Sequence, residues 1–204
     1  MAEQKLTGKK IAILATDGVE QIELVEPRKA LEEAGAQTEL VSLEEGQIQG
    51  FEHLDHADKL DVDKTVQQAS ADDYDGVLIP GGVANGDFLR ADEDACRFVA
   101  AFAAQKKPIA SICHGPWILV ETGIVKGRTI TSWPSLKTDV ENAGGTWVDE
   151  EVHVDGGLTT SRKPDDLPAF NAKMIEEFCE GPHDDAPQPD GRFAREGETA
   201  ETAS

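Results

Sequence analysis

A cysteine followed directly by a histidine stands near the middle of the sequence, in the stretch Ala-Ser-Ile-Cys-His-Gly-Pro at 110–116. An apolar run precedes Cys113 and a helical pattern follows it, so we expect a buried strand, a sharp turn and a helix. A side chain at such a corner lies at the carboxyl edge of a parallel sheet, where α/β proteins hold their sites. The start of a helix also favours thiolate over thiol. The pattern predicts a nucleophilic Cys113 with His114 beside it.

The same residues also allow Cys113 to be an ordinary buried residue and not a nucleophile. The strand, corner and helix resemble the nucleophile elbow of hydrolases, but the Gly-x-Ser-x-Gly sequence is missing. A free cysteine is also commonly a small buried apolar residue. Cys96 and Cys179 lie in helical patterns. We therefore expect Cys113 to be the most reactive thiol and the other two to react slowly.

Two glycines, Gly81 and Gly82, follow a buried run at 76–80. Glycines at the carboxyl end of a strand leave backbone N–H groups open to an anion, although a simple turn explains them equally well. His53 and His56 have acidic neighbours that suit a metal, but we favour a solvated loop there. No other metal-ligand spacing is present, and no metal or cofactor is expected.

The elements that must position these residues alternate between strands and helices, which is typical of a parallel α/β sheet. No Gly-x-Gly-x-x-Gly opens the first helix, so a dinucleotide site is not expected. Residues 44–64 are interpreted as a loop or short antiparallel strands, and a β-hairpin is expected over 146–161. The expected strands are 9–16, 38–43, 76–80, 109–112 and 128–131. The expected helices are 20–34, 87–105, one that continues over 117–120 to a stop at Gly123, 136–143 and 164–179.

The composition narrows the classes of function. The chain has 204 residues and a net charge of −21, which disfavours binding to a phosphate backbone. No apolar run is long enough to span a membrane, and the first ten residues lack a signal-peptide core. The odd number of cysteines, three, favours free thiols and a cytoplasmic location. We expect a polar extension at 1–8, one domain at 9–180 and a disordered acidic tail at 181–204.

Several segments together resemble the ThiJ/PfpI superfamily, and specifically its PfpI (intracellular protease I) branch. The resemblance covers roughly residues 9–180 and implies a flavodoxin-like, three-layer α/β sandwich, with a mainly parallel sheet, helices on both faces and a small β-hairpin. The segments that carry it are Asp-Gly-Val-Glu at 17–20, Leu-Ile-Pro-Gly-Gly at 78–82, the stretch 110–116, Val-Lys-Gly-Arg at 125–128, and 161–170.

The resemblance also implies roles for individual residues. It makes Cys113 the nucleophile, His114 its partner and Glu20 the carboxylate close to the thiol. An ionised carboxylate there would oppose the thiolate, so we expect the two groups to share a proton; an ordinary carboxylate of the first helical turn, facing water, is the alternative. It places an oxyanion pocket at the backbone amides of Gly82 and His114, next to Gly81. It implies that Asp87 reaches in from a neighbouring subunit to complete a triad; capping the helix that it begins is the alternative.

A related group, the class I glutamine amidotransferases, pairs its cysteine with a distant His-x-Glu. The sequence His153-Val154-Asp155 resembles that motif only superficially, with an aspartate in place of the glutamate. It lies in the expected hairpin, where the PfpI branch needs no histidine, so we do not expect it to be catalytic.

The resemblance implies a stress-related, cysteine-dependent hydrolase that forms a homodimer or larger homo-oligomer. Its substrates would be peptides and proteins, or small reactive carbonyl compounds in a glyoxalase or deglycase reaction. The sequence does not distinguish between these two classes of substrate. A stress chaperone or a redox sensor that works through oxidation of Cys113 is the alternative function.

Overall fold

Seven strands form the central sheet of the computed structural model, which describes residues 4–193. Their order is β11-β12-β8-β7-β1-β3-β6, and every neighbouring pair is parallel except β11 with β12. The order β3-β1-β7-β8-β12 is that of flavodoxin-like folds, which confirms the predicted fold class. The strands are β1 (Lys10–Leu14), β3 (Gln37–Ser42), β6 (Lys64–Thr65), β7 (Gly76–Ile79), β8 (Ile109–Ile112), β11 (Val152–Asp155) and β12 (Leu158–Ser161).

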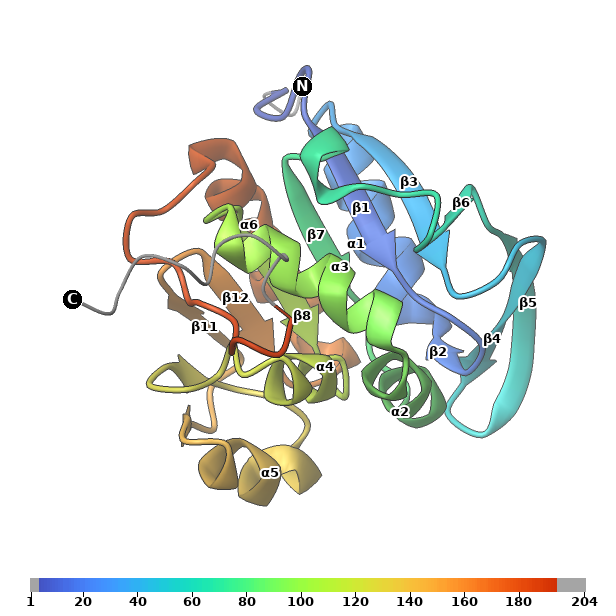
Figure 1. Ribbon diagram of the computed structural model, residues 1–204. Coiled ribbons are helices and arrows are strands. Elements are labelled where there is room, and N and C mark those ends of the chain that lie inside the picture. Colours follow the sequence, from blue (N-terminus) through green and yellow to red (C-terminus); the bar gives the residue numbers. More distant parts are fainter. Residues whose placement is uncertain (1–3, 194–204) are drawn as a thin grey trace.

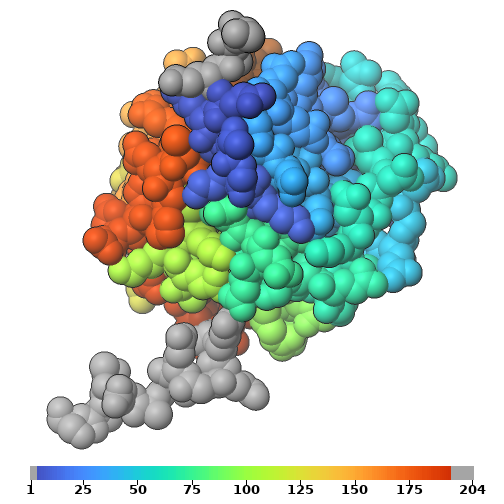
Figure 2. All heavy atoms as spheres, turned by 90° about the horizontal axis from the view of Figure 1, so that it is seen from above, coloured from blue at the N-terminus to red at the C-terminus, as the bar shows by residue number. Residues whose placement is uncertain are grey.

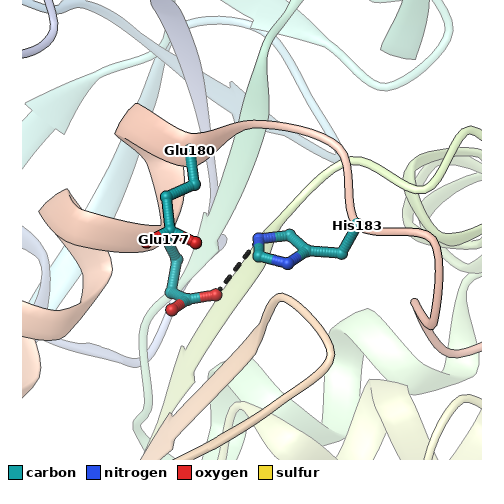
Figure 3. Close-up of side chains that lie close together, drawn as sticks. All are labelled: Glu177, Glu180 and His183. Atoms are coloured by element: carbon teal, nitrogen blue, oxygen red, sulfur yellow. Dashed lines mark ion pairs between the residues drawn. The ribbon is translucent and has the colours of Figure 1, made fainter.

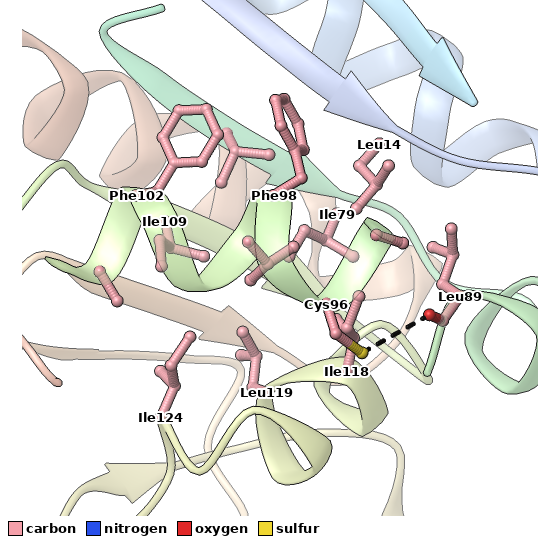
Figure 4. Close-up of a cluster of buried hydrophobic side chains, with 14 of the residues drawn as sticks. Leu14, Ile79, Leu89, Cys96, Phe98, Phe102, Ile109, Ile118, Leu119 and Ile124 are labelled. Atoms are coloured by element: carbon pink, nitrogen blue, oxygen red, sulfur yellow. Dashed lines mark hydrogen bonds between the residues drawn. The ribbon is translucent and has the colours of Figure 1, made fainter. Parts of the chain in front are cut away.

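Helices cover both faces of this sheet (Figure 1). One face packs against α1 (Gln21–Glu33) and α6 (Leu167–Glu180). The other packs against α3 (Glu93–Ala104), whose Phe98 and Phe102 lie in the cluster drawn in Figure 4. Every residue of β7 and β8 is buried, because both faces are covered, and their sequences are therefore apolar except for Ser111.

Three further helices lie near the carboxyl ends of the strands: α2 (Val83–Ala91), α4 (Pro116–Glu121) and α5 (Lys137–Asn142). The single helix predicted over 87–105 is wrong, because the chain breaks at Asp92. The backbone of Asp92 is extended, and its side chain accepts a hydrogen bond from the N–H of Ala95 as the N-cap of α3. Asp87 therefore lies within α2 and does not cap a helix.

Two smaller sheets complete the fold. β2 (Val19–Glu20) pairs in parallel with β4 (Gln47–Glu52), and β4 pairs antiparallel with β5 (Asp55–Asp61), so the interpretation of 44–64 as short antiparallel strands is confirmed. The hairpin predicted over 146–161 is confirmed only for β11 and β12. β10 (Thr146–Trp147) pairs instead with β9 (Thr129–Ile130). Short 3₁₀ turns lie at Ala71–Asp73, Pro134–Leu136 and Pro164–Asp166.

Both ends of the described chain pack on the domain, unlike the extension and tail expected from the sequence. Leu6 is fully buried, and its N–H donates to the carbonyl of Ala34. Figure 2 shows these first residues (blue) between the early part of the chain (light blue) and the C-terminal helix (orange). Residues 182–193 run back along the domain and place Phe193 against the core cluster around α3. Residues 194–204 of the expected tail lie outside the described residues.

Within 4–193, no helix is both long enough and apolar enough to cross a membrane.

Candidate active site

Cys113 occupies the corner between β8 and α4 in a left-handed backbone conformation, with a φ of 61°. Such a φ costs a non-glycine residue about 1–3 kcal/mol, so the surrounding structure must hold it. Two hydrogen bonds do so: the N–H of Cys113 donates to Ser161 at 3.0 Å, and its carbonyl accepts from the N–H of Trp133 at 2.9 Å. The chain turns so sharply here that the sulfur is presented at the carboxyl edge of the sheet.

The imidazole of His114 lies beside the thiol, with 3.2 Å between Nδ1 and the sulfur of Cys113. Two indole rings fix the imidazole: Trp133 stacks on it at a centroid distance of 5.7 Å, and Trp117 meets it edge-on at 5.2 Å. Burial lowers the pKa of His114 to about 4. The ring is therefore neutral near pH 7, and Nδ1 can accept the thiol proton when the ring proton is on Nε2.

The carboxyl group against the sulfur belongs to Glu23, not to Glu20 as predicted. Glu23 is fully buried on the first turn of α1, within hydrogen-bonding reach of the sulfur of Cys113. Its Oε2 accepts a hydrogen bond from the N–H of Gly81 at 3.0 Å. The helix begins directly after Glu20, and side chains in the first turn point back toward the helix start. The side chain of Glu23 therefore points toward the carboxyl edge of the sheet.

Glu20 has a different position on the rim of the same site. Its carboxylate accepts a hydrogen bond from the N–H of His53, at 3.1 Å for Oε2, and its own N–H donates to the carbonyl of Gly81. It thereby ties the turn between β4 and β5 to the sheet edge. His53 and His56 belong to this hairpin region, where no cluster of three metal ligands is found among the described residues.

The electrostatics of the site favour a resting thiol. Burial and the nearby carboxyl of Glu23 raise the pKa of Cys113, and the backbone N–H groups of Gly82 and His114 lower it. The helix that was expected to favour thiolate, α4, has only six residues, so its dipole is weak. Burial raises the pKa of Glu23 to about 8, and the charge of Glu20 adds to the rise. Glu23 is therefore protonated near pH 7 and can donate to sulfur.

Gly82 places its N–H at the sulfur because it adopts a φ of 96°, which L side chains rarely tolerate. A Cβ atom at this position would overlap the carbonyl oxygen of Gly18. The amides of Gly82 and His114 thus both point at the sulfur of Cys113. Two donors that converge near a nucleophile can stabilise an oxyanion.

A cavity of about 570 Å³ opens over these groups. Its walls are mostly apolar, and its mouth carries the exposed side chains of Leu54, Val83 and Phe88. A site of this kind suits a small organic substrate held by contact and oriented by a few polar groups. Its lining includes Gly18, Glu20, Glu23, Phe51, His53, Gly82, Asp87, Cys113, His114, Trp117, Trp133 and Pro164.

The remaining predicted residues divide into two groups. Asp87 lines the cavity from α2, but among the described residues it makes no hydrogen bond or ion pair with His114. His153 pairs with Glu150 at 2.8 Å and does not line the cavity, in agreement with the expectation that it is not catalytic. Of the other thiols, Cys96 is buried, which raises its pKa to about 12, and Cys179 is exposed on α6.

Family comparison agrees with this geometry. The model of the DJ-1/PfpI family matches residues 9–177, which covers most of the chain and includes every residue described above at the sheet edge. This chain belongs to the DJ-1/PfpI family. The resemblance found in the sequence is thereby confirmed.

Named relatives in the DJ-1/PfpI family carry two kinds of activity in their names. "Putative cysteine protease YraA" of Bacillus subtilis (strain 168) is 44% identical over 168 residues, which cover 82% of this chain and 96% of that protein. "Deglycase TK1284" of Thermococcus kodakarensis is 37% identical over 167 residues, which cover 82% of this chain and 98% of that protein.

A solved DJ-1/PfpI structure shows the same fold. It is a two-domain protein of Anabaena variabilis that contains DJ-1/ThiJ/PfpI-like and ferritin-like domains. The TM-score is 0.77 at 33% identity, and the match covers 82% of this chain and 47% of that longer chain. The similarity extends over one of its domains.

Two buried residues of this DJ-1/PfpI site were missed in the sequence. Asn85 is fully buried; its Oδ1 accepts from the N–H of Thr16 at 2.8 Å, and its Nδ2 donates to the carbonyls of Pro80 and Gly81. It fastens α2 to the ends of β1 and β7. A polar residue in the segment from Gly82 to Gly86 is expected to be exposed, so the sequence did not indicate that Asn85 is buried. Glu23 lies three residues after Glu20, and only its spacing within the first helical turn could have identified it.

Proposed function

We propose that this protein is a cysteine-dependent enzyme that acts on small reactive carbonyl compounds and on their protein adducts, as a glyoxalase or deglycase. The observation that carries the proposal is the contact between the sulfur of Cys113 and Nδ1 of His114, 3.2 Å apart on the floor of a small apolar cavity. The names of both relatives, a cysteine protease and a deglycase, support an enzymatic function in the family.

The groups at the sheet edge suggest how a 2-oxoaldehyde would react. As the sulfur attacks the aldehyde carbon, His114 takes the thiol proton and the carbonyl electron pair moves to oxygen, where the amide of Gly82 donates a hydrogen bond. The former aldehyde hydrogen then moves, as a proton, to the neighbouring carbon, and His114 returns its proton to the oxygen of that carbon, which yields a 2-hydroxy thioester. Water then hydrolyses the thioester and regenerates the thiol. The net reaction converts one 2-oxoaldehyde and one water molecule to one 2-hydroxy acid.

Carbonyl chemistry fits the site better than peptide hydrolysis does. A peptidase must protonate a departing amine and bind an extended chain, whereas a 2-oxoaldehyde reacts without losing a leaving group. The cavity of about 570 Å³ also suits a small molecule rather than an extended chain.

The test is a substrate panel of methylglyoxal, a glycated peptide, fluorogenic peptides and casein. We expect wild type to convert methylglyoxal to lactate, and C113A to be slower by at least about 100-fold because it lacks the nucleophile. C179A is the matched control, because Cys179 is exposed and lies away from the cavity. Equal rates for wild type and C113A would refute the proposal. Cleavage of peptides alone would make the protein a peptidase, and holdase activity retained in C113A would favour a chaperone.

We also propose a cytoplasmic role in the response to carbonyl stress. The three cysteines are all free, as expected for thiols kept reduced.

A further inference from the structure

Three side chains that could bind a metal ion meet at the end of α6, away from the cavity that holds Cys113. Glu177 and Glu180 lie three residues apart on one face of the last helical turn, and His183 returns toward them after the chain turns at Gly181 (Figure 3). One ligand atom from each residue lies within 4.8 Å of the other two. Among residues 4–193, no second group of three such side chains meets this criterion.

Glu177 and His183 form an ion pair through two buried atoms, but the pair lacks the geometry of a hydrogen bond (Figure 3). Glu177 is 7% exposed, and its Oε2 has no hydrogen-bond partner in the described structure. Nε2 of His183 is likewise buried and unsatisfied, although the two atoms are only 3.2 Å apart. Buried polar atoms almost always make hydrogen bonds, so these two atoms, which are paired by charge alone, keep lone pairs that a bound cation can take up.

The spacing of the two atoms fits a tetrahedral metal centre. With metal–ligand distances near 2.0–2.1 Å, two ligands of a tetrahedral zinc ion lie about 3.3 Å apart. The observed separation of Glu177 Oε2 and His183 Nε2 is 3.2 Å. Glu180 is exposed and can turn its carboxylate toward the same point. The carboxyl end of a helix also attracts cations through its partial negative charge.

The position of His183 is fixed by the fold itself. Its N–H donates to the carbonyl of Lys106 at 3.0 Å, and its ring packs on the turn at Gly157. A Cβ atom on Gly157, which has a φ of 78°, would lie 2.6 Å from Cδ2 of His183. A glycine at 157 therefore leaves room for this ring to face Glu177. The backbone thus orients the imidazole toward Glu177 before any ion binds.

We propose that Glu177, Glu180 and His183 bind a divalent transition-metal ion of the zinc class, with water as the fourth ligand. One imidazole with two carboxylates suits Zn²⁺, whereas Mg²⁺ and Ca²⁺ prefer oxygen ligands alone. None of the three residues lines the cavity of Cys113. The ion would join α6 to residues 182–193, so its effect is on the attachment of this segment and not on the carbonyl chemistry.

The test is titration of the full chain with Zn²⁺ alone, followed by calorimetry. C113S and C179S are introduced first, so that reactive and exposed thiols do not compete for the ion. We expect one equivalent to bind, and E177Q and H183A each to weaken binding roughly tenfold or more, as loss of a ligand requires. H153A is the matched control, because His153 also pairs with a glutamate but has no third ligand.

A second measurement separates metal binding from damage to the fold. E180Q alters an exposed side chain, so it should fold normally and still bind Zn²⁺ more weakly. Zn²⁺ should also slow tryptic cleavage at the exposed Arg192 in the parent protein and not in E177Q. Absence of binding at 100 micromolar Zn²⁺, or equal affinity in the parent, E177Q, E180Q and H183A, would overturn the proposal. Glu177 and His183 would then form an ion pair only.

Discussion

Glu23 and Cys113 approach each other across the carboxyl edge of the sheet, one from the first turn of α1 and the other from the corner after β8. Oε2 of Glu23 accepts a hydrogen bond from the N–H of Gly81, and its buried Oε1 has no hydrogen-bond partner among the described residues. A protonated carboxyl can donate to a thiolate, whereas an ionised one repels it. The two groups therefore titrate as a coupled pair.

The first prediction concerns stability against pH. Burial raises the pKa of Glu23 from 4.5 to about 8, so between these values the folded state holds a proton that the unfolded state has lost. The free energy of unfolding should therefore fall as pH rises through this window, by on the order of 4 kcal/mol from this group. E23Q cannot ionise and should lose this pH dependence. Denaturant unfolding at pH 5 and pH 9 measures it.

The control for this prediction is E26Q, which removes an exposed carboxylate from the same helix. It should keep the pH dependence of the wild type. A wild-type protein and E23Q with parallel stability curves from pH 5 to pH 9 would show that Glu23 does not hold its proton.

The second prediction concerns the reactivity of Cys113. Below pH 8 the protonated Glu23 donates to the thiolate, and above it the carboxylate opposes the thiolate. The ratio of Cys113 alkylation rates, E23Q over wild type, should therefore rise as pH passes through about 8. Rates are followed by mass spectrometry of the Cys113 peptide, because the exposed Cys179 also reacts. If E20Q, and not E23Q, changes the profile, the sequence-based assignment of Glu20 was correct.

The third prediction concerns oxidation by mild peroxide. A protonated Glu23 can donate a short hydrogen bond to a sulfenate or sulfinate oxygen on Cys113, which stabilises that product. Wild type should therefore accumulate sulfinic acid at Cys113, and E23Q should pass on to sulfonic acid at lower peroxide. Peptide mass spectrometry across a peroxide series measures the two products. Identical product ratios in both proteins would remove Glu23 from this role.

The fourth prediction concerns association. Leu54, Val83 and Phe88 expose 92%, 58% and 50% of their surface at the mouth of the cavity, and an apolar patch of this kind is typical of an interface. We expect at least a dimer at micromolar concentration, with Asp87 near the contact. F88D should shift sedimentation toward the monomer. A wild-type protein that sediments only as a monomer would exclude an active site shared between subunits.

The parts of the site that the sequence predicted are those set by local chemistry. The apolar run before Cys113 can only be buried, and a sharp corner must follow it, so the elbow and the paired glycines were predictable. The choice between Glu20 and Glu23 was not, because it depends on the residue at which α1 begins. A shift of three residues moves a carboxylate from the cavity rim to the sulfur.

The division of 87–105 into α2 and α3 was missed for a similar reason. Asp92 fits a continuous helix as a solvated polar residue, but it also fits an N-cap, and the sequence does not distinguish the two. The C-terminal segment was misjudged because its composition is that of a disordered chain. Its attachment depends on a few groups, Ala186 and Phe193 among them, that have no periodic pattern.

The last prediction follows from that attachment and replaces the expectation that the whole tail is dispensable. Deletion of 194–204 should leave the melting temperature unchanged, whereas deletion of 182–204 should lower it by on the order of 5–10 °C, equivalent to about 2–4 kcal/mol in a domain of this size. The larger deletion exposes the core beside Phe193 and breaks the bond from the N–H of Asp190 to the carbonyl of Thr122, 2.9 Å long. It also removes the contact of Arg192 with the carbonyl of Glu121. Differential scanning calorimetry of both deletions in EDTA separates these contacts from any bound metal. Equal melting temperatures for the two deletions would show that residues 182–193 contribute nothing to the stability of the domain.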